Sequence, residues 1–171
     1  LFRTLSQHVL SPAKIVTEMN NSISDNNESN MFVTLIVGIL DLETGILKLC
    51  NAGHNPPILI YPDGQVSYLE FKTQIFVGVV EDFKYSDEEV VLEKESKLFL
   101  YTDGVTEAEN INKELYGEEK LLEMLSDNAS SDVRTTVNVV VDSIASHVKE
   151  AEASDDLTIL LIQYEPGTAN S

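Results

Sequence analysis

The residues of this sequence best suited to chemistry are two acidic motifs that adjoin apolar segments. Asp103 follows the apolar run 98–102, and Asp155 and Asp156 directly precede the apolar run 157–162. One strand can leave a sheet at the edge where another enters it, so Asp103 and Asp155 could meet although they are far apart in the sequence. Converging carboxylates bind hard divalent cations, because oxygen ligands suit magnesium, manganese and calcium.

Each acidic motif also has a purely structural interpretation. A Tyr-Thr-Asp-Gly sequence after a strand commonly forms a turn in which the Asp, here Asp103, bonds to nearby backbone. Asp155 and Asp156 could cap a strand or end a helix in a solvated turn. Adjacent carboxylates repel each other, however, and a divalent cation or hydrogen-bond donors would remove that cost. Thr158 could bond back to this turn and hold Asp155 in position.

A third distinctive segment is the loop 51–57, Asn-Ala-Gly-His-Asn-Pro-Pro, whose glycine and prolines shape it between two strands. A lone histidine such as His54 is usually structural. If functional, His54 could hydrogen-bond a phosphate or carry a proton, since its ordinary pKa is near neutrality. The single cysteine, Cys50, lies in a predicted strand, where packing is favoured over reactivity.

Turn and cap signals define the elements that must position these residues. We expect a helix from Ser11-Pro12, with an apolar face of Ile15, Val16, Met19 and Ile23. Three antiparallel pairs should follow: 31–40 with 46–51, 57–61 with 65–71, and 89–93 with 97–102. Strand 31–40 is apolar on both faces, which predicts cover on both sides.

The C-terminal part changes character. Helices are predicted after Gly117 and after the cap Ser131-Asp132, the second with an apolar stripe, and a last strand over 155–164. The stripe consists of Val133, Val137, Val140, Val141, Ile144 and Val148. Because the helices precede and follow the strands without alternating with them, the fold class is α+β.

Composition excludes some functions. The 171 residues suit one domain, predicted over 1–165 with a polar tail at 166–171. A net charge of −18 disfavours nucleic acid as a partner. No apolar run is long enough to insert into a membrane, and one cysteine fits a reducing compartment, so we predict a cytoplasmic location.

Together the motifs resemble the SpoIIE-like branch of the PPM metal-dependent serine/threonine protein phosphatases. They are Thr34, the turn 41–45, Asn51-Ala-Gly-His-x-Pro-Pro57, Gly78, Tyr101-Thr-Asp-Gly-Val-Thr-Glu-Ala108, Tyr116-Gly117 and Asp155-Asp156-x-Thr158. The match runs across nearly the whole chain. It implies an α-β-β-α sandwich of antiparallel sheets flanked by helices, which lacks its first strands here.

The resemblance also implies a site. Asp103 and Asp155 would be catalytic, and Asp103, Gly104, Asp155 and Asp156 would bind metal, with two Mn²⁺ or Mg²⁺ ions in the complete domain. Substrate binding or loop support would fall to His54, Asn51, Thr158 and Glu107. The substrate would be a phosphorylated regulatory protein, typically an anti-sigma antagonist in bacterial partner switching. Residues 1–19 would serve regulation and homodimer contacts.

Two upstream motifs of the family, Gly-Asp and Gly-Asp-x-x-Gly, do not occur in this sequence. We therefore expect the complete protein to be an enzyme and this fragment alone to be inactive. Two alternatives stay open: a noncatalytic partner-binding domain or inactive fragment of the same fold, and, more remotely, a calcium-stabilised interaction module.

Overall fold

The computed structural model describes residues 11–25, 27, 31–72, 74–149, 151 and 156–166. These residues form two compact units, and each has its own sheet and core. The first unit contains residues 1–56, 70–92 and 166–171 of the chain, and the second contains residues 57–69 and 93–165.

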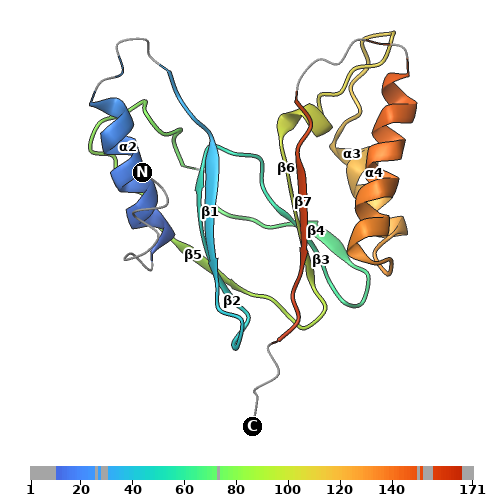
Figure 1. Ribbon diagram of the computed structural model, residues 1–171, viewed down its shortest axis with the longest axis horizontal. Helices are drawn as coiled ribbons and strands as arrows, with labels where there is room; N and C mark the ends of the chain where they lie inside the picture. The colour runs from blue at the N-terminus through green and yellow to red at the C-terminus, as the bar shows by residue number, and fades with distance from the viewer. Residues whose placement is uncertain are drawn as a thin grey trace. The chain divides into compact units, whose positions relative to one another are not determined.

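The first unit has a three-stranded antiparallel sheet covered by one helix (Figure 1). The strand order is β1-β2-β5, with β1 at Leu35–Leu40, β2 at Ile46–Ala52 and β5 at Glu88–Val91, and the helix is α2, Pro12–Ser24. Apolar residues of α2 pack against the sheet and form the core with it: Ala13, Ile15, Val16, Val37, Cys50, Ala52, Val77 and Tyr85. The predicted apolar face of α2 is confirmed, because Met19 and Ile23 also pack on this core.

Helix α2 begins where its sequence predicts. The Ser11 hydroxyl accepts a hydrogen bond from the Lys14 N–H at 3.3 Å, and Pro12 occupies the first turn, where a missing N–H costs nothing. The Asp87 carboxylate accepts hydrogen bonds from the Ser11 hydroxyl at 2.6 Å and the Ala13 N–H at 2.5 Å. A negative charge at this end of the helix is favoured by the helix dipole.

The second unit has a four-stranded antiparallel sheet with two helices on one face (Figure 1). Its strand order is β4-β3-β6-β7: β4 is Val66–Tyr68, β3 is Ile58–Ile60, β6 is Lys97–Tyr101 and β7 is Ile159–Gln163. The helices are α3, Glu118–Asp127, and α4, Val133–Val148, and a 3-10 turn η1 spans Asp103–Val105. Phe99, Leu121, Leu125, Val140 and Ile144 are central to its core.

A buried lysine joins this sheet to the helices. Lys97, at the start of β6, is only 6% exposed, and its ammonium donates to the carbonyl oxygens of Ala129 at 2.7 Å and Ser131 at 2.5 Å in the α3–α4 connection. Burial lowers the pKa of Lys97, since a charged group loses hydration in the interior. The two carbonyls compensate for part of that loss.

The α+β class, with antiparallel sheets flanked by helices, is confirmed, but three details of the prediction are wrong. Segments 89–93 and 97–102 do not pair with each other: β5 pairs with β2, and β6 pairs with β3 and β7. The segment 31–40 is not covered on both sides, because Met31, Phe32 and Val33 are exposed and only Val37 is buried. On α4, Val141 points to solvent and Thr136 is buried instead.

Among the described residues, the helices are all too short or too polar to cross a membrane.

Candidate metal centre

The pairing of β6 with β7 determines where Asp103 lies. These strands are antiparallel neighbours, with Tyr101 opposite Ile159, so the end of β6 and the start of β7 share one edge of the sheet. The ladder continues beyond the strands, because the Thr102 N–H donates to the Thr158 carbonyl at 3.1 Å. Asp103, which follows β6, therefore lies at the same edge of the sheet as residues 156–158, which lead into β7.

Thr102 joins the two segments through its side chain as well. Its hydroxyl donates to the Asp156 carbonyl at 3.1 Å and accepts from the Thr158 N–H at 3.0 Å. Thr158 thus contributes its backbone N–H to this edge. The predicted bond between Thr158 and the turn at Asp155 falls outside the described residues and stays a prediction. Sequence reasoning missed Thr102, because its role depends on which residues it faces across the β6–β7 pairing, and no local pattern gives that register.

Gly104 allows the two segments to touch. A Cβ built on Gly104 would lie 2.5 Å from the Asp156 carbonyl oxygen and 3.0 Å from its carbonyl carbon. Carbon atoms do not approach backbone atoms this closely, so only glycine fits without a shift. The backbone at Asp103-Gly104 and at Asp156 is therefore in direct contact.

Asp103 is held by the tight turn that it begins. One of its carboxylate oxygens, Oδ1, accepts from the Gly104 N–H at 3.0 Å. Its backbone carbonyl accepts from the Glu107 N–H at 2.8 Å and the Thr106 hydroxyl at 3.3 Å. Asp103, Glu107 and Asp156 are all exposed, so a cation from solvent can reach the two Asp residues.

Asp155, one of the two residues of the predicted pair, lies outside the described residues. Among the residues that are described, no group of three or more His, Cys, Asp or Glu side chains could hold a metal ion. The structure thus brings Asp103 and Gly104 together with Asp156 and Thr158. The meeting of Asp103 with Asp155 stays a prediction.

Asn51 and His54 lie in one loop of the first unit. The Asn51 side chain accepts from the His54 N–H at 2.8 Å and donates to the His54 carbonyl at 2.9 Å, which closes the loop. Gly53 has φ +75°, and a side chain there would also overlap the Phe76 ring. The Nδ1 atom of His54 is buried and has no hydrogen-bond partner within the described ranges. The geometry suits Asn51 for loop support.

Cys50 lies beside this loop and is 1% exposed. Burial raises the pKa of its thiol to about 12, because the thiolate would lose its hydration. A thiol that stays protonated is a poor nucleophile. The prediction that Cys50 packs as a buried strand residue is confirmed.

Comparison with solved structures defines the class of fold. The SiaA-PP2C domain of Pseudomonas aeruginosa superposes with a TM-score of 0.81 at 21% identity, covering 96% of this chain and 68% of that one. The phosphatase domain and regulatory fragment of SpoIIE from Bacillus subtilis gives a TM-score of 0.78 at 15% identity, covering 95% and 47%. The chain has the PP2C-like phosphatase fold.

The family follows from the sequence match. The model of the family described as Stage II sporulation protein E (SpoIIE) matches residues 1–165, and the chain belongs to this family. Phosphoserine phosphatase RsbP of Bacillus subtilis is 27% identical over 170 residues, and phosphoserine phosphatase RsbU of the same organism is 23% identical over 161 residues. The matches cover 96% and 94% of this chain but only 40% and 47% of those proteins.

Some structures of this fold were solved with metal. They include the SpoIIE phosphatase domain presoaked with Mn, RsbX in complex with magnesium and the catalytic domain of PstP in complex with two manganese ions, at TM-scores of 0.67, 0.65 and 0.63. All three are under 20% identical to this chain, so they establish a shared fold.

Proposed function

We propose that the natural protein containing this chain is a metal-dependent phosphatase that removes phosphate from phosphoserine or phosphothreonine on a regulatory protein. Membership of the SpoIIE family and the two phosphoserine phosphatases among its relatives support this activity. The observation that carries the proposal is the attachment of the Asp156–Thr158 segment directly beside Asp103. An anti-sigma antagonist in a bacterial partner-switching pathway is the proposed substrate.

The residues at this edge suit the metals of the proposed reaction. Carboxylates are hard oxygen donors of the kind that Mg²⁺ and Mn²⁺ prefer, and the side chains of Asp103 and Asp156 are both exposed. Asp103, Asp155 and Asp156 would hold the metal, with the Gly104 backbone beside them. When bound, a pair of such ions supplies Lewis acidity to a phosphoryl group and lowers the pKa of water.

The chain's own residues would position these donors. The Thr102 hydroxyl fixes the backbone on both sides of Leu157, and the hydrogen bonds to the Asp103 carbonyl fix the turn η1. Donors held in place before a ligand arrives lose little conformational entropy on binding. Further ligands would come from residues outside this sequence, and we propose that the 171 residues alone do not turn over.

A noncatalytic partner-binding domain is the second candidate. The observation behind it is that the family's Gly-Asp and Gly-Asp-x-x-Gly motifs do not occur in this sequence. Such a domain would keep the fold and show no metal-dependent turnover.

Hydrolysis of p-nitrophenyl phosphate by the natural full-length protein distinguishes the two candidates. We expect turnover with added Mn²⁺, its loss with a chelator, and a fall of about a hundredfold or more in Asp103→Asn, because a metal ligand is removed. The matched control is Asp63→Asn in the β3–β4 turn of the same unit, where the Asp63 carboxylate accepts a hydrogen bond from the Gln65 N–H. No Mn²⁺-dependent turnover, or equal rates in wild type and Asp103→Asn, would reject the phosphatase.

A further inference from the structure

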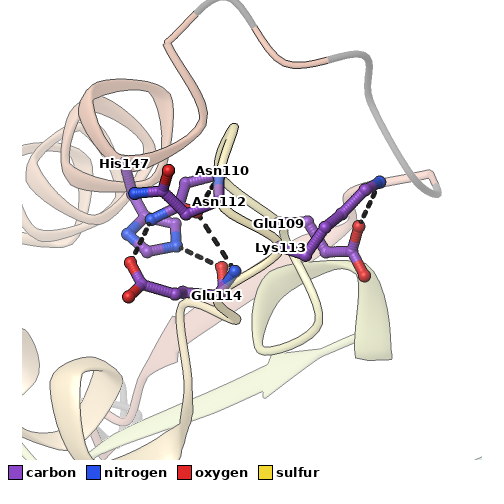
Figure 2. A network of polar contacts seen from close by, with 6 residues as sticks. All are labelled: Glu109, Asn110, Asn112, Lys113, Glu114 and His147. Atoms are coloured by element: carbon purple, nitrogen blue, oxygen red, sulfur yellow. Dashed lines mark hydrogen bonds and ion pairs between the residues drawn. The ribbon is translucent and has the colours of Figure 1, made fainter.

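A short hairpin, residues 109–115, follows the Asp103 turn in the second unit (Figure 2). Glu109 and Leu115 form an antiparallel bridge, and the Asn110 N–H donates to the Glu114 carbonyl at 3.0 Å. The Asn110 side chain accepts from the N–H groups of Asn112 at 2.8 Å and Glu114 at 3.1 Å. The turn is therefore ordered by its own polar groups.

Helix α4 is hydrogen-bonded to this hairpin and to the residue that follows it. His147 on α4 makes a hydrogen bond of 2.9 Å from its Nε2 to the Glu114 carbonyl (Figure 2). The neighbouring Tyr116 donates to the Ser143 hydroxyl at 2.9 Å, and its ring meets the His147 ring edge-on at 5.6 Å. The hairpin is thus fastened to α4 beside the face that packs in the core, because His147 lies within one helical turn of Ile144.

The base of the hairpin is continuous with the candidate metal centre. The Gly117 N–H donates to the Thr106 carbonyl and the Tyr116 N–H donates to the Ala108 carbonyl, both at 2.9 Å. Thr106 in turn bonds to the Asp103 carbonyl. If the phosphorylated residue of a substrate lies at Asp103, residues a few positions away in the substrate can reach the hairpin. An extended chain advances by about 3.3–3.6 Å per residue.

The hairpin presents apolar side chains that do not stabilise the core. Ile111 at its turn is 69% exposed, and Leu115 at its end is 54% exposed. Covering large aliphatic side chains is favourable, and an ordered backbone loses little entropy when a partner covers them.

A pocket of about 670 Å³ lies beside Leu115. The residues that line it include Glu118, Glu119 and Glu123, with Lys120 as the one basic residue among them. The Lys120 ammonium lies 4.8 Å from the centre of the Tyr116 ring. The pocket is thus negative and has an apolar rim, which complements a basic side chain next to an apolar one.

We propose that the 109–115 hairpin docks the phosphoprotein substrate. In this proposal, which rests on the phosphatase function above, an apolar residue near the phosphoserine covers Ile111 and Leu115, and a Lys or Arg enters the adjacent pocket. His147 and Tyr116 are positioning residues that keep the hairpin at the required place. The hairpin then selects substrates and takes no part in the chemical step.

Three probes with the natural full-length protein and Mn²⁺ test this assignment. They are p-nitrophenyl phosphate and two phosphoserine peptides of equal length that carry either Leu and Lys or two Glu residues beside the phosphoserine. Wild type should prefer the Leu/Lys peptide by about tenfold in kcat/KM. Ile111→Asp should remove this preference through KM, and Ile111→Ala should weaken it, while turnover of p-nitrophenyl phosphate stays unchanged.

Leu42→Asp is the matched control, because Leu42 is an aliphatic residue 61% exposed in the β1–β2 turn. It should keep the preference. Turnover of all three probes without discrimination, or with discrimination that survives Ile111→Asp in folded protein, would overturn the docking role alone. Failure to hydrolyse p-nitrophenyl phosphate would instead overturn the phosphatase function, and the docking role with it.

Discussion

At the scale of single residues, the candidate site depends on two residues that carry no charge. Thr102 bonds to the backbone on both sides of Leu157, and Gly104 leaves room for the Asp156 carbonyl. Uncharged residues thus hold in place the backbone of the acidic residues that would bind metal. Changing the support should affect both stability and metal-dependent activity.

Gly104→Ala is the sharpest test of this support. The added Cβ would lie 2.5 Å from the Asp156 carbonyl oxygen, so the backbone must move, and we expect the free energy of unfolding to fall by about 1–3 kcal/mol. Denaturant unfolding and Mn²⁺-dependent turnover should both decline. In the control Gly38→Ala, the one close contact of the new Cβ, at 2.8 Å, is with the flexible end of the Leu49 side chain, so the effect should be smaller. A Gly104→Ala protein as stable and active as wild type would show that this contact is unimportant.

The sequence predicts where the acidic motifs lie, but it misses the residues that hold them. Asp103 and the Asp155-Asp156 motif could be expected at one edge because each adjoins an apolar strand, and β6 and β7 do pair. The role of Thr102 depends on the register of that pairing, which leaves no local pattern. Similarly, the clamp between Asn51 and His54 requires the backbone of the loop, which the sequence describes only as glycine- and proline-rich.

At the scale of elements, local signals predicted helix starts and hairpin turns well. Ser11 caps α2, and the Asp132 carboxylate caps α4 by accepting from the Thr135 N–H at 3.0 Å. The turn 41–45 joins β1 to β2, as predicted. These signals act over a few residues and need no tertiary contact to be recognised.

The partner of β5 could not be predicted in this way. Segments 89–93 and 97–102 look like a hairpin because only a short polar turn separates them. In the structure, the Leu92 N–H donates to the Gly45 carbonyl and the Glu95 N–H to the Tyr164 carbonyl, so each side of the turn bonds to a different sheet. Glu95 has φ +71°, which turns the chain between them. Long-range pairing decides this arrangement.

The α4 cap makes a prediction about pH. Hydrogen bonds from the Thr135 side chain and backbone lower the pKa of Asp132 below its ordinary value of 3.8. Its contribution to stability is therefore complete above that pH and is lost as the pH falls through the lower folded value. Asp132→Ala should lower the thermal midpoint at pH 7, and its difference from wild type should shrink in acid.

Asp142→Ala is the control for this effect, because Asp142 is exposed in the middle of the same helix. It should not reproduce the loss at pH 7. A difference between wild type and Asp132→Ala that stays constant from pH 7 into acid would contradict the assigned role of the cap.

At the scale of the whole molecule, the chain consists of two units that each bury their own core. The described part of the candidate metal centre and the 109–115 hairpin both belong to the second unit. The chain's net charge of −18 would favour substrates with basic residues near the phosphate. Family and fold class could be predicted from motifs spread along the chain, whereas the exposed hairpin side chains required the structure.

In the proposed centre, Asp103 and Asp155 hold the same cations, and calorimetric titration of Mn²⁺ can decide whether they do. The natural full-length protein should be compared with Asp103→Asn, Asp155→Asn and the double variant. We expect each single change to weaken binding strongly and the double change to add little, because ligands of one centre are not independent. If the two losses in binding free energy simply add, or neither variant binds more weakly, the residues do not share a centre.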